Sequence, residues 1–74
     1  IKMKLKELEP KTLESNEKRL NYLLEMYKYY QNVMYSFKTI CKTVLLANAY
    51  IQDIDNELIT DYNYTEEDLF ELFV

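Results

Sequence analysis

The sequence predicts an all-α fold, in which one long amphipathic helix and short terminal helices assemble into a helical bundle or a coiled coil. No Gly and no Pro interrupts residues 11–59. Along most of that stretch apolar residues return every seven positions, which is the repeat of a helix that packs against other helices. A chain of 74 residues buries only about 60% of its unfolded surface by itself, so we expect other chains to cover the apolar stripe.

Residues 1–74 are expected to form a single helical module for oligomerisation or interaction. The chain begins with Ile rather than Met, which indicates a fragment of a larger parent protein or a processed product. Residues 1–10 are interpreted as an N-terminal extension or a short helix. Apolar residues alternate with Lys at the start of this segment, as in a strand, but Ile1, Leu5 and Leu8 also share one face of a helix.

Residues 11–59 are predicted to form one continuous helix. Pro10 suits the first turn of this helix, where its missing N–H costs nothing, although the Ser-Asn pair at residues 15–16 could cap a later start. A folded hairpin is the alternative. Its bend would fall at the locally weakest points of the helix, residues 29–32 or 47–48.

The heptad repeat defines the interface that we expect to bury the stripe. With Leu13 at position a, the apolar a and d positions are joined by apolar g positions, which makes the stripe too wide for a two-stranded coiled coil. A bundle of three or four helices is therefore expected. The predicted oligomer interface consists of Leu20, Leu23, Tyr27, Tyr30, Met34, Phe37, Cys41, Val44, Asn48 and Ile51.

Two polar features modify this interface. Asn48 at position a would fix the register if it paired with another polar group, or it marks the point where the seam fades toward Asp55. Tyr22, Tyr29 and Tyr50 fall at position c and form a second, broken seam beside the first. We interpret this seam as a further bundle contact, with partly exposed surface as the alternative.

A short C-terminal helix is predicted over residues 65–73. Thr65 and Asp68 have the spacing of a capping box, and Tyr64 and Leu69 have the spacing of a hydrophobic staple. The apolar residues of this helix either fold back on the chain or dock on a partner. They are Leu69, Phe70, Leu72 and Phe73.

Charge is divided unequally along the chain. Residues 1–42 carry all nine basic side chains and five acidic ones, whereas residues 43–74 carry eight acidic side chains and no basic one. This division favours antiparallel pairing, in which the basic half of one helix meets the acidic half of another. The expected partners are therefore further copies of this chain in an antiparallel arrangement, or related helical subunits.

No pattern in the sequence indicates an enzyme, a metal site or a cofactor site. The chain has no His, so Cys41 has no imidazole base to activate it and is interpreted as a small core residue. Asp53, Asp55 and Glu57 resemble part of a calcium loop, but no Gly follows them and their period is helical. We expect no catalytic residue, no bound metal and no cofactor.

Neither nucleic acid nor a membrane is an expected ligand. The basic residues scatter around the helix instead of forming the coherent stripe that follows a phosphate backbone. No charge-free run of about 18 apolar residues is present to span a bilayer. A single Cys fits a reducing compartment, so an intracellular location, cytoplasmic or nuclear, is expected.

The predicted function is a non-enzymatic protein–protein interaction module that mediates self-association of a larger parent protein. A trimer or a tetramer fits the wide stripe, and a dimer is the next alternative. The second hypothesis is a scaffold subunit of a hetero-complex. In that case the acidic and apolar C-terminal segment, or the Tyr-rich helix face, would dock on another protein.

Overall fold

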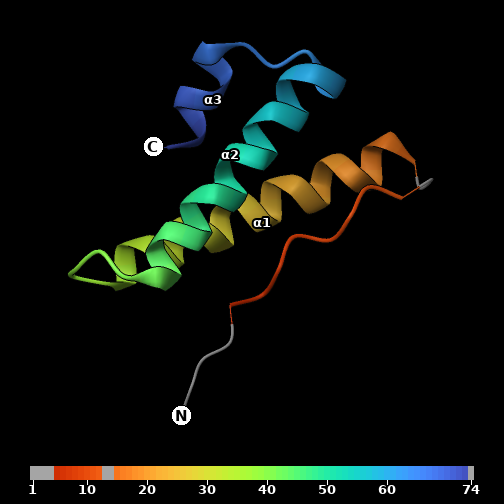
Figure 1. Cartoon of the computed structure of the whole chain (residues 1–74). Coiled ribbons are helices and arrows are strands. Elements are labelled where there is room, and N and C mark those ends of the chain that lie inside the picture. The colour runs from red at the N-terminus through yellow and green to blue at the C-terminus, as the bar shows by residue number, and fades with distance from the viewer. Residues whose placement is uncertain (1–4, 13–14, 74) are drawn as a thin grey trace.

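Three helices make up most of the described part of the chain, residues 5–12 and 15–73, in the computed structural model (Figure 1). In chain order they are α1 (Asn16–Ser36), α2 (Lys42–Tyr62) and α3 (Glu66–Leu72). The all-helical prediction is confirmed for these residues, and α1 and α2 pack against each other as in a helical bundle. Predictions for residues 1–4, 13–14 and 74 fall outside the described residues.

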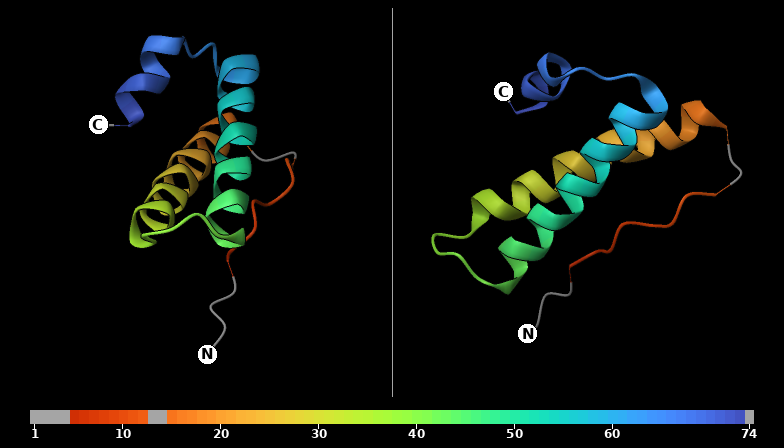
Figure 2. Two further views of the ribbon diagram at one scale, coloured as in Figure 1. Left: turned by 60° about the vertical axis from the view of Figure 1, so that its left-hand side comes forward. Right: turned by 45° about the horizontal axis from the view of Figure 1, so that its top comes forward.

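The prediction of one helix over residues 11–59 is wrong. The chain turns back between α1 and α2, which form an antiparallel hairpin (Figures 1 and 2). The turn comprises residues 37–41, and both of its end residues have extended backbone: Phe37 has φ −103° and ψ 135°, and Cys41 has φ −138° and ψ 175°. Hairpin formation buries much of the apolar stripe within one chain, which an unbroken helix cannot do.

The position of the turn follows from the lengths of the two helices. Both α1 and α2 contain 21 residues, so a break between them pairs two helices of equal length. The two predicted bends are also wrong, because residues 29–32 lie inside α1 and residues 47–48 lie inside α2. A bend at either place would pair helices of unequal length and leave part of the stripe exposed to water.

The start of α1 is set by a side-chain cap. The Ser15 hydroxyl oxygen accepts a hydrogen bond from the Lys18 amide at 3.4 Å, so the later of the two possible starts is used. Residues 5–12 contain no helix and run as a drawn-out segment beside the hairpin (Figure 1), here called the N-terminal arm. The extension interpretation of residues 1–10 therefore fits the described part of that segment, and the short-helix interpretation does not.

Backbone geometry ends α2 and starts α3. Asn63 adopts the left-handed conformation with φ 57° and ψ 30°, which Asn tolerates better than most residues, and the Tyr64 amide donates to the Leu58 carbonyl at 3.1 Å. The predicted capping box of α3 is confirmed. The Thr65 amide donates to Asp68 Oδ2 at 2.9 Å, and the Asp68 amide donates to Thr65 Oγ1 at 3.2 Å.

The core lies between α1 and α2. Its buried apolar residues all occupy positions a, d or g of the heptad repeat, and each large one contributes about 1.5–3 kcal/mol through removal from water. They are Leu23, Met26, Tyr27, Tyr30, Ala47, Ile51, Ile54 and Leu58. The N-terminal arm and α3 cover opposite sides of this hairpin (Figures 1 and 2).

Candidate protein-interaction surfaces

The predicted oligomer interface is divided by the fold. Leu23, Tyr27, Tyr30 and Ile51 are buried between α1 and α2. The interface role that was assigned to these four residues requires correction, because their side chains already contact the opposite helix of the same chain. The hairpin itself covers much of the stripe, so a second chain is not needed to bury these four side chains.

The remaining predicted interface residues differ in exposure. Leu20 and Met34 are partly buried and pack against the core. Cys41, the last residue of the turn, and Val44 on α2 are also partly buried. The two exposed members are Phe37, which lies in the turn, and Asn48, which lies on α2.

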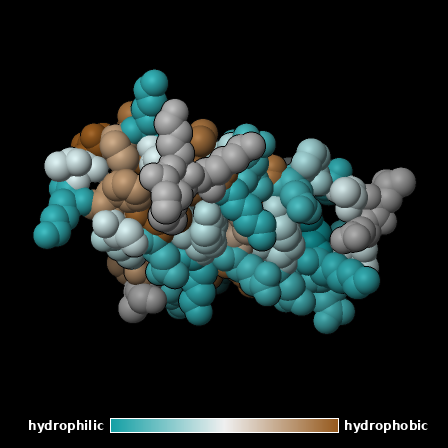
Figure 3. Space-filling model, turned by 90° about the horizontal axis from the view of Figure 1, so that it is seen from below, coloured by the Kyte–Doolittle hydropathy of each residue, from teal (hydrophilic) through white to brown (hydrophobic). Residues whose placement is uncertain are grey.

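Large apolar side chains gather around the turn. Ile40 is 80% exposed and Tyr35 is 69% exposed, and Lys38 and Lys42 lie among them without an acidic residue between residues 35 and 46. We call this surface the turn patch; its apolar members are Tyr35, Phe37, Ile40, Leu45 and Leu46. Figure 3 shows apolar surface concentrated at the end of the molecule that carries the turn and hydrophilic surface at the opposite end.

The C-terminal helix α3 has an inner and an outer face. Of the predicted docking residues, Leu69 and Leu72 pack partly against the hairpin core. Phe70 is 71% exposed, and Phe73 is half exposed while its ring edge meets Tyr27 at a centroid distance of 5.8 Å. We call the exposed side the α3 outer face; it consists of Phe70, Phe73, Glu66 and Glu67.

Tyrosine hydroxyls hold the N-terminal arm against the hairpin. The Tyr29 hydroxyl oxygen accepts the Lys6 amide at 3.2 Å, and the Tyr22 hydroxyl oxygen accepts the Glu9 amide at 2.7 Å. The buried Tyr30 hydroxyl donates to the Lys6 carbonyl at 3.0 Å. The Tyr-rich helix face therefore contacts the arm of its own chain.

Apolar and stacking contacts complete this side of the molecule. Leu5 and Leu8 pack partly against the core. Tyr50, from α2, stacks on Tyr30 with a centroid distance of 5.0 Å. Burial raises the pKa of the Tyr30 hydroxyl, and this keeps it protonated and able to donate its hydrogen bond.

Arg19 connects three parts of the chain and was missed as a key residue at the sequence level. It is buried on α1, and its guanidinium pairs with both carboxylate oxygens of Glu57 on α2 at 2.7 and 2.8 Å. It also donates to the Glu9 carbonyl of the arm at 3.0 Å. The Glu57 carboxylate raises the pKa of Arg19. Its place at a g position of the apolar stripe is a signal that could have predicted a buried ion pair.

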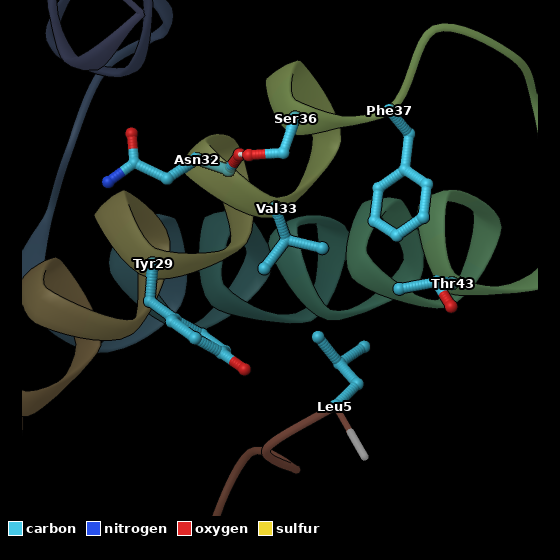
Figure 4. A pocket seen from close by; sticks show the side chains of 7 residues that line it. All are labelled: Leu5, Tyr29, Asn32, Val33, Ser36, Phe37 and Thr43. Carbon is cyan, nitrogen blue, oxygen red and sulfur yellow. Dashed lines mark hydrogen bonds between the residues drawn. The ribbon is translucent and has the colours of Figure 1, made fainter. Parts of the chain in front are cut away.

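A small apolar cavity of about 180 Å³ lies where the arm meets the turn end of the hairpin (Figure 4). Val33, Phe37 and Leu5 surround it from α1, the turn and the arm. The Ser36 hydroxyl donates its hydrogen to the Asn32 carbonyl at 2.7 Å. The other lining residues are Tyr29, Asn32, Ser36 and Thr43.

Among residues 5–12 and 15–73, two buried side-chain atoms have no hydrogen-bond partner: the Tyr27 hydroxyl oxygen and Asp55 Oδ1. Burial, followed by the neighbouring Asp55 carboxylate, raises the pKa of Tyr27 to about 12. Burial also raises the pKa of Asp55. The raised pKa values disfavour ionisation of Tyr27 and Asp55. Their buried polar atoms lack the hydrogen bonds that the tyrosines on the arm side make.

Within residues 5–12 and 15–73, no group of three or more His, Cys, Asp or Glu side chains is arranged to hold a metal ion. None of the helices α1 to α3 combines the length and the apolar character that crossing a bilayer requires. Comparison of the chain with protein-family models, with curated proteins and with solved structures finds no match.

Proposed function

We propose that this chain is a non-enzymatic protein–protein interaction module that self-associates head to tail, with the turn patch of one copy against the α3 outer face of the next. One observation carries this proposal: two exposed apolar surfaces of opposite charge occur on one chain. Residues 35–46 contain Lys38 and Lys42 and no acidic residue, whereas residues 66–73 contain four acidic residues and no basic one.

Apolar burial would supply most of the stability of this contact. The turn patch offers several side chains that are between 43% and 80% exposed, and their removal from water contributes about 25 cal/mol per Å². Exposed charge pairs each add roughly 0–1 kcal/mol. The charges would therefore select the head-to-tail orientation over contacts between like surfaces.

A contact between two different surfaces is heterologous, so it closes into a ring or continues as a filament. A closed ring of three or four copies agrees with the predicted trimer or tetramer. Such a ring would raise the valency of a parent protein, and multivalent display strengthens binding at distant sites without new contacts there.

The test uses two variants that each lack one of the surfaces. Ile40→Glu/Leu45→Glu removes the turn patch, and Phe70→Lys removes the α3 outer face while leaving the contact between Phe73 and Tyr27 intact. Each variant alone is expected to sediment as a monomer, whereas an equimolar mixture forms a heterodimer through the one surface that each retains. Raised salt should weaken the native oligomers only modestly, because it screens the charge pairs but leaves the apolar burial in place.

The exposed change Asn21→Lys on α1 is the matched control and should leave assembly unchanged. Circular dichroism verifies that every variant retains its helix content. A native chain that is monomeric at millimolar concentration contradicts self-association. Loss of assembly in both variants without recovery on mixing contradicts the head-to-tail arrangement, and then the α3 outer face is to be tested against other proteins.

A further inference from the structure

The N-terminal arm binds the hairpin as a peptide ligand would bind a receptor. It runs extended along the Tyr-rich face, and the hairpin contacts its main chain at Lys6, Glu9 and Pro10. Side chains of the arm also contact the hairpin: Leu5 and Leu8 pack on the core, and Lys11 pairs with Asp61. None of these contacts depends on the covalent connection between the arm and α1.

We propose that the Tyr-rich face of the hairpin is a binding site for an extended peptide. When the chain's own N-terminal arm (the resident arm) is displaced, the N-terminal arm of a second copy occupies this site. The site consists of Arg19, Tyr22, Tyr29 and Tyr30 of α1 together with Asp61 of α2. None of these residues belongs to the turn patch or the α3 outer face, although Phe37 of the turn patch also lines the adjoining cavity. The inference therefore stands whether or not those two surfaces associate.

The polar pattern of the site matches an extended backbone. Tyr22 and Tyr29 lie seven residues apart on α1 and accept amides three residues apart on the arm. Seven residues of helix rise about 10.5 Å, and three residues of extended chain span about the same distance. Because a helical ligand uses its own amides internally, this spacing selects an extended segment.

The apolar pattern of the site selects the sequence of the ligand. Leu5 and Leu8 are three residues apart and both pack against the core. The cavity of about 180 Å³ beside Leu5 and Tyr29 continues the apolar surface toward the turn. An acidic residue, Asp61, lies at the other end and pairs with Lys11. The preferred ligand therefore carries two leucines at this spacing followed by a basic residue, as the arm itself does.

The resident arm competes with any ligand in solution. Its tether gives it an effective concentration of the order of millimolar, so a peptide in solution binds the native chain only weakly. A displaced arm removes this competition. In an assembly of copies, the same site would let one copy accept the arm of its neighbour, because the exchanged arm makes every contact again.

The experiment measures binding of a synthetic peptide of residues 5–12 to full-length chains by chemical-shift titration. The acceptor chain carries Leu5→Asp/Leu8→Asp, which displaces its own arm. The peptide is expected to bind this acceptor at least tenfold more tightly than the native chain, with the largest shifts at Tyr22, Tyr29 and Tyr30. A peptide with Asp at both leucine positions should not bind.

A second acceptor chain keeps the test valid if the first one does not fold. Lys6→Pro/Glu9→Pro removes the two amide donors at exposed positions without adding charge beside the core. In either acceptor, the further change Tyr22→Phe/Tyr29→Phe should weaken peptide binding several-fold. Equal binding to the acceptor and the native chain, or no saturable shift with a folded acceptor, overturns the inference. Full affinity after removal of both hydroxyls does so as well.

Discussion

The N-terminal arm and α3 lie on opposite sides of the same hairpin, but they are held by different kinds of contact. The arm has no regular secondary structure, yet its main chain is bound by three tyrosine hydroxyls and by Arg19. By contrast, α3 has a complete capping box and none of its residues is buried. Its attachment consists of partly buried leucines, the edge contact of Phe73 with Tyr27, and a bond from Gln31 to the Leu72 carbonyl at 3.2 Å.

This difference shows that the secondary structure of a segment and the strength of its contacts with the hairpin are separate properties. A capping box stabilises a helix whether or not that helix packs against anything. Tyrosine hydroxyls that meet main-chain amides attach a segment without giving it secondary structure. We therefore expect the arm to share the stability of the hairpin, and α3 to open at a lower free energy than the hairpin.

The largest effect is expected at Arg19, which joins α1 to α2 and to the arm. Arg19→Ala leaves the Glu57 carboxylate partly buried without its partner and removes two bonds to arm carbonyls. The free energy of unfolding should fall by about 2–4 kcal/mol. Urea denaturation measures this change, and the exposed neighbour Lys18→Ala should alter stability by less than about 0.5 kcal/mol.

A smaller loss is expected when one arm bond is deleted. Tyr30→Phe keeps the stacking on Tyr50 and removes only the hydroxyl that donates to the Lys6 carbonyl. The expected loss is about 1 kcal/mol. The change Tyr35→Phe at an exposed tyrosine is the matched control. If both variants unfold at the same urea concentration as the native chain, the arm is not held through this bond.

A modest gain is expected at Asp55. Because burial raises its folded-state pKa, the protonated form is favoured in the folded chain, and its stabilising contribution is lost as pH rises through that pKa. Asp55→Asn should therefore raise the free energy of unfolding near neutral pH by roughly 0.5 kcal/mol, and the gain should vanish below the ordinary Asp pKa. Thermal unfolding at several pH values measures this profile, and a gain that is independent of pH would falsify the assignment.

The smallest global effect is expected at Thr65. Thr65→Ala removes the cap of α3, which costs about 1 kcal/mol of local helix stability. Because α3 opens separately, the global free energy of unfolding should change by less than about 0.5 kcal/mol. Hydrogen exchange should show faster exchange in α3 and unchanged protection in α1 and α2. Equal acceleration in all three helices would mean that α3 unfolds together with the hairpin.

The helical fold and the identity of the buried stripe could be predicted from the sequence, because both depend on the spacing of apolar residues along the chain. The heptad positions a, d and g include every apolar residue that is buried in the described part of the chain, and the capping box at Thr65 and Asp68 forms as its spacing indicates. The partner of the stripe could not be read in this way. The period of one helix is the same whether a second chain or the same chain covers it.

The place of the turn and the contacts of the N-terminal arm could not be predicted from the sequence, for related reasons. Residues 37–41 contain no Gly or Pro, so no local signal outweighs the preference for helix; burial of both helix faces decides the break. The Tyr22 and Tyr29 seam was recognised, but its ligand lies more than ten residues away in the chain. Arg19 was grouped with scattered surface charges because its partner, Glu57, is separated from it by 38 residues.

The surfaces and sites described above all depend on α1 and α2 forming a hairpin within one chain. One distance tests this directly. Tyr62 at the end of α2 donates to the carbonyl of Asn16 at the start of α1 at 3.1 Å. Spin labels on Cys substitutions at Glu17 and Thr60, in a Cys41→Ser chain diluted with unlabelled native chain, should lie on the order of 20 Å apart, because packed helix axes are about 10 Å apart and each label adds several Å. A continuous helix would place them about 65 Å apart at 1.5 Å per residue, and that result would contradict the account.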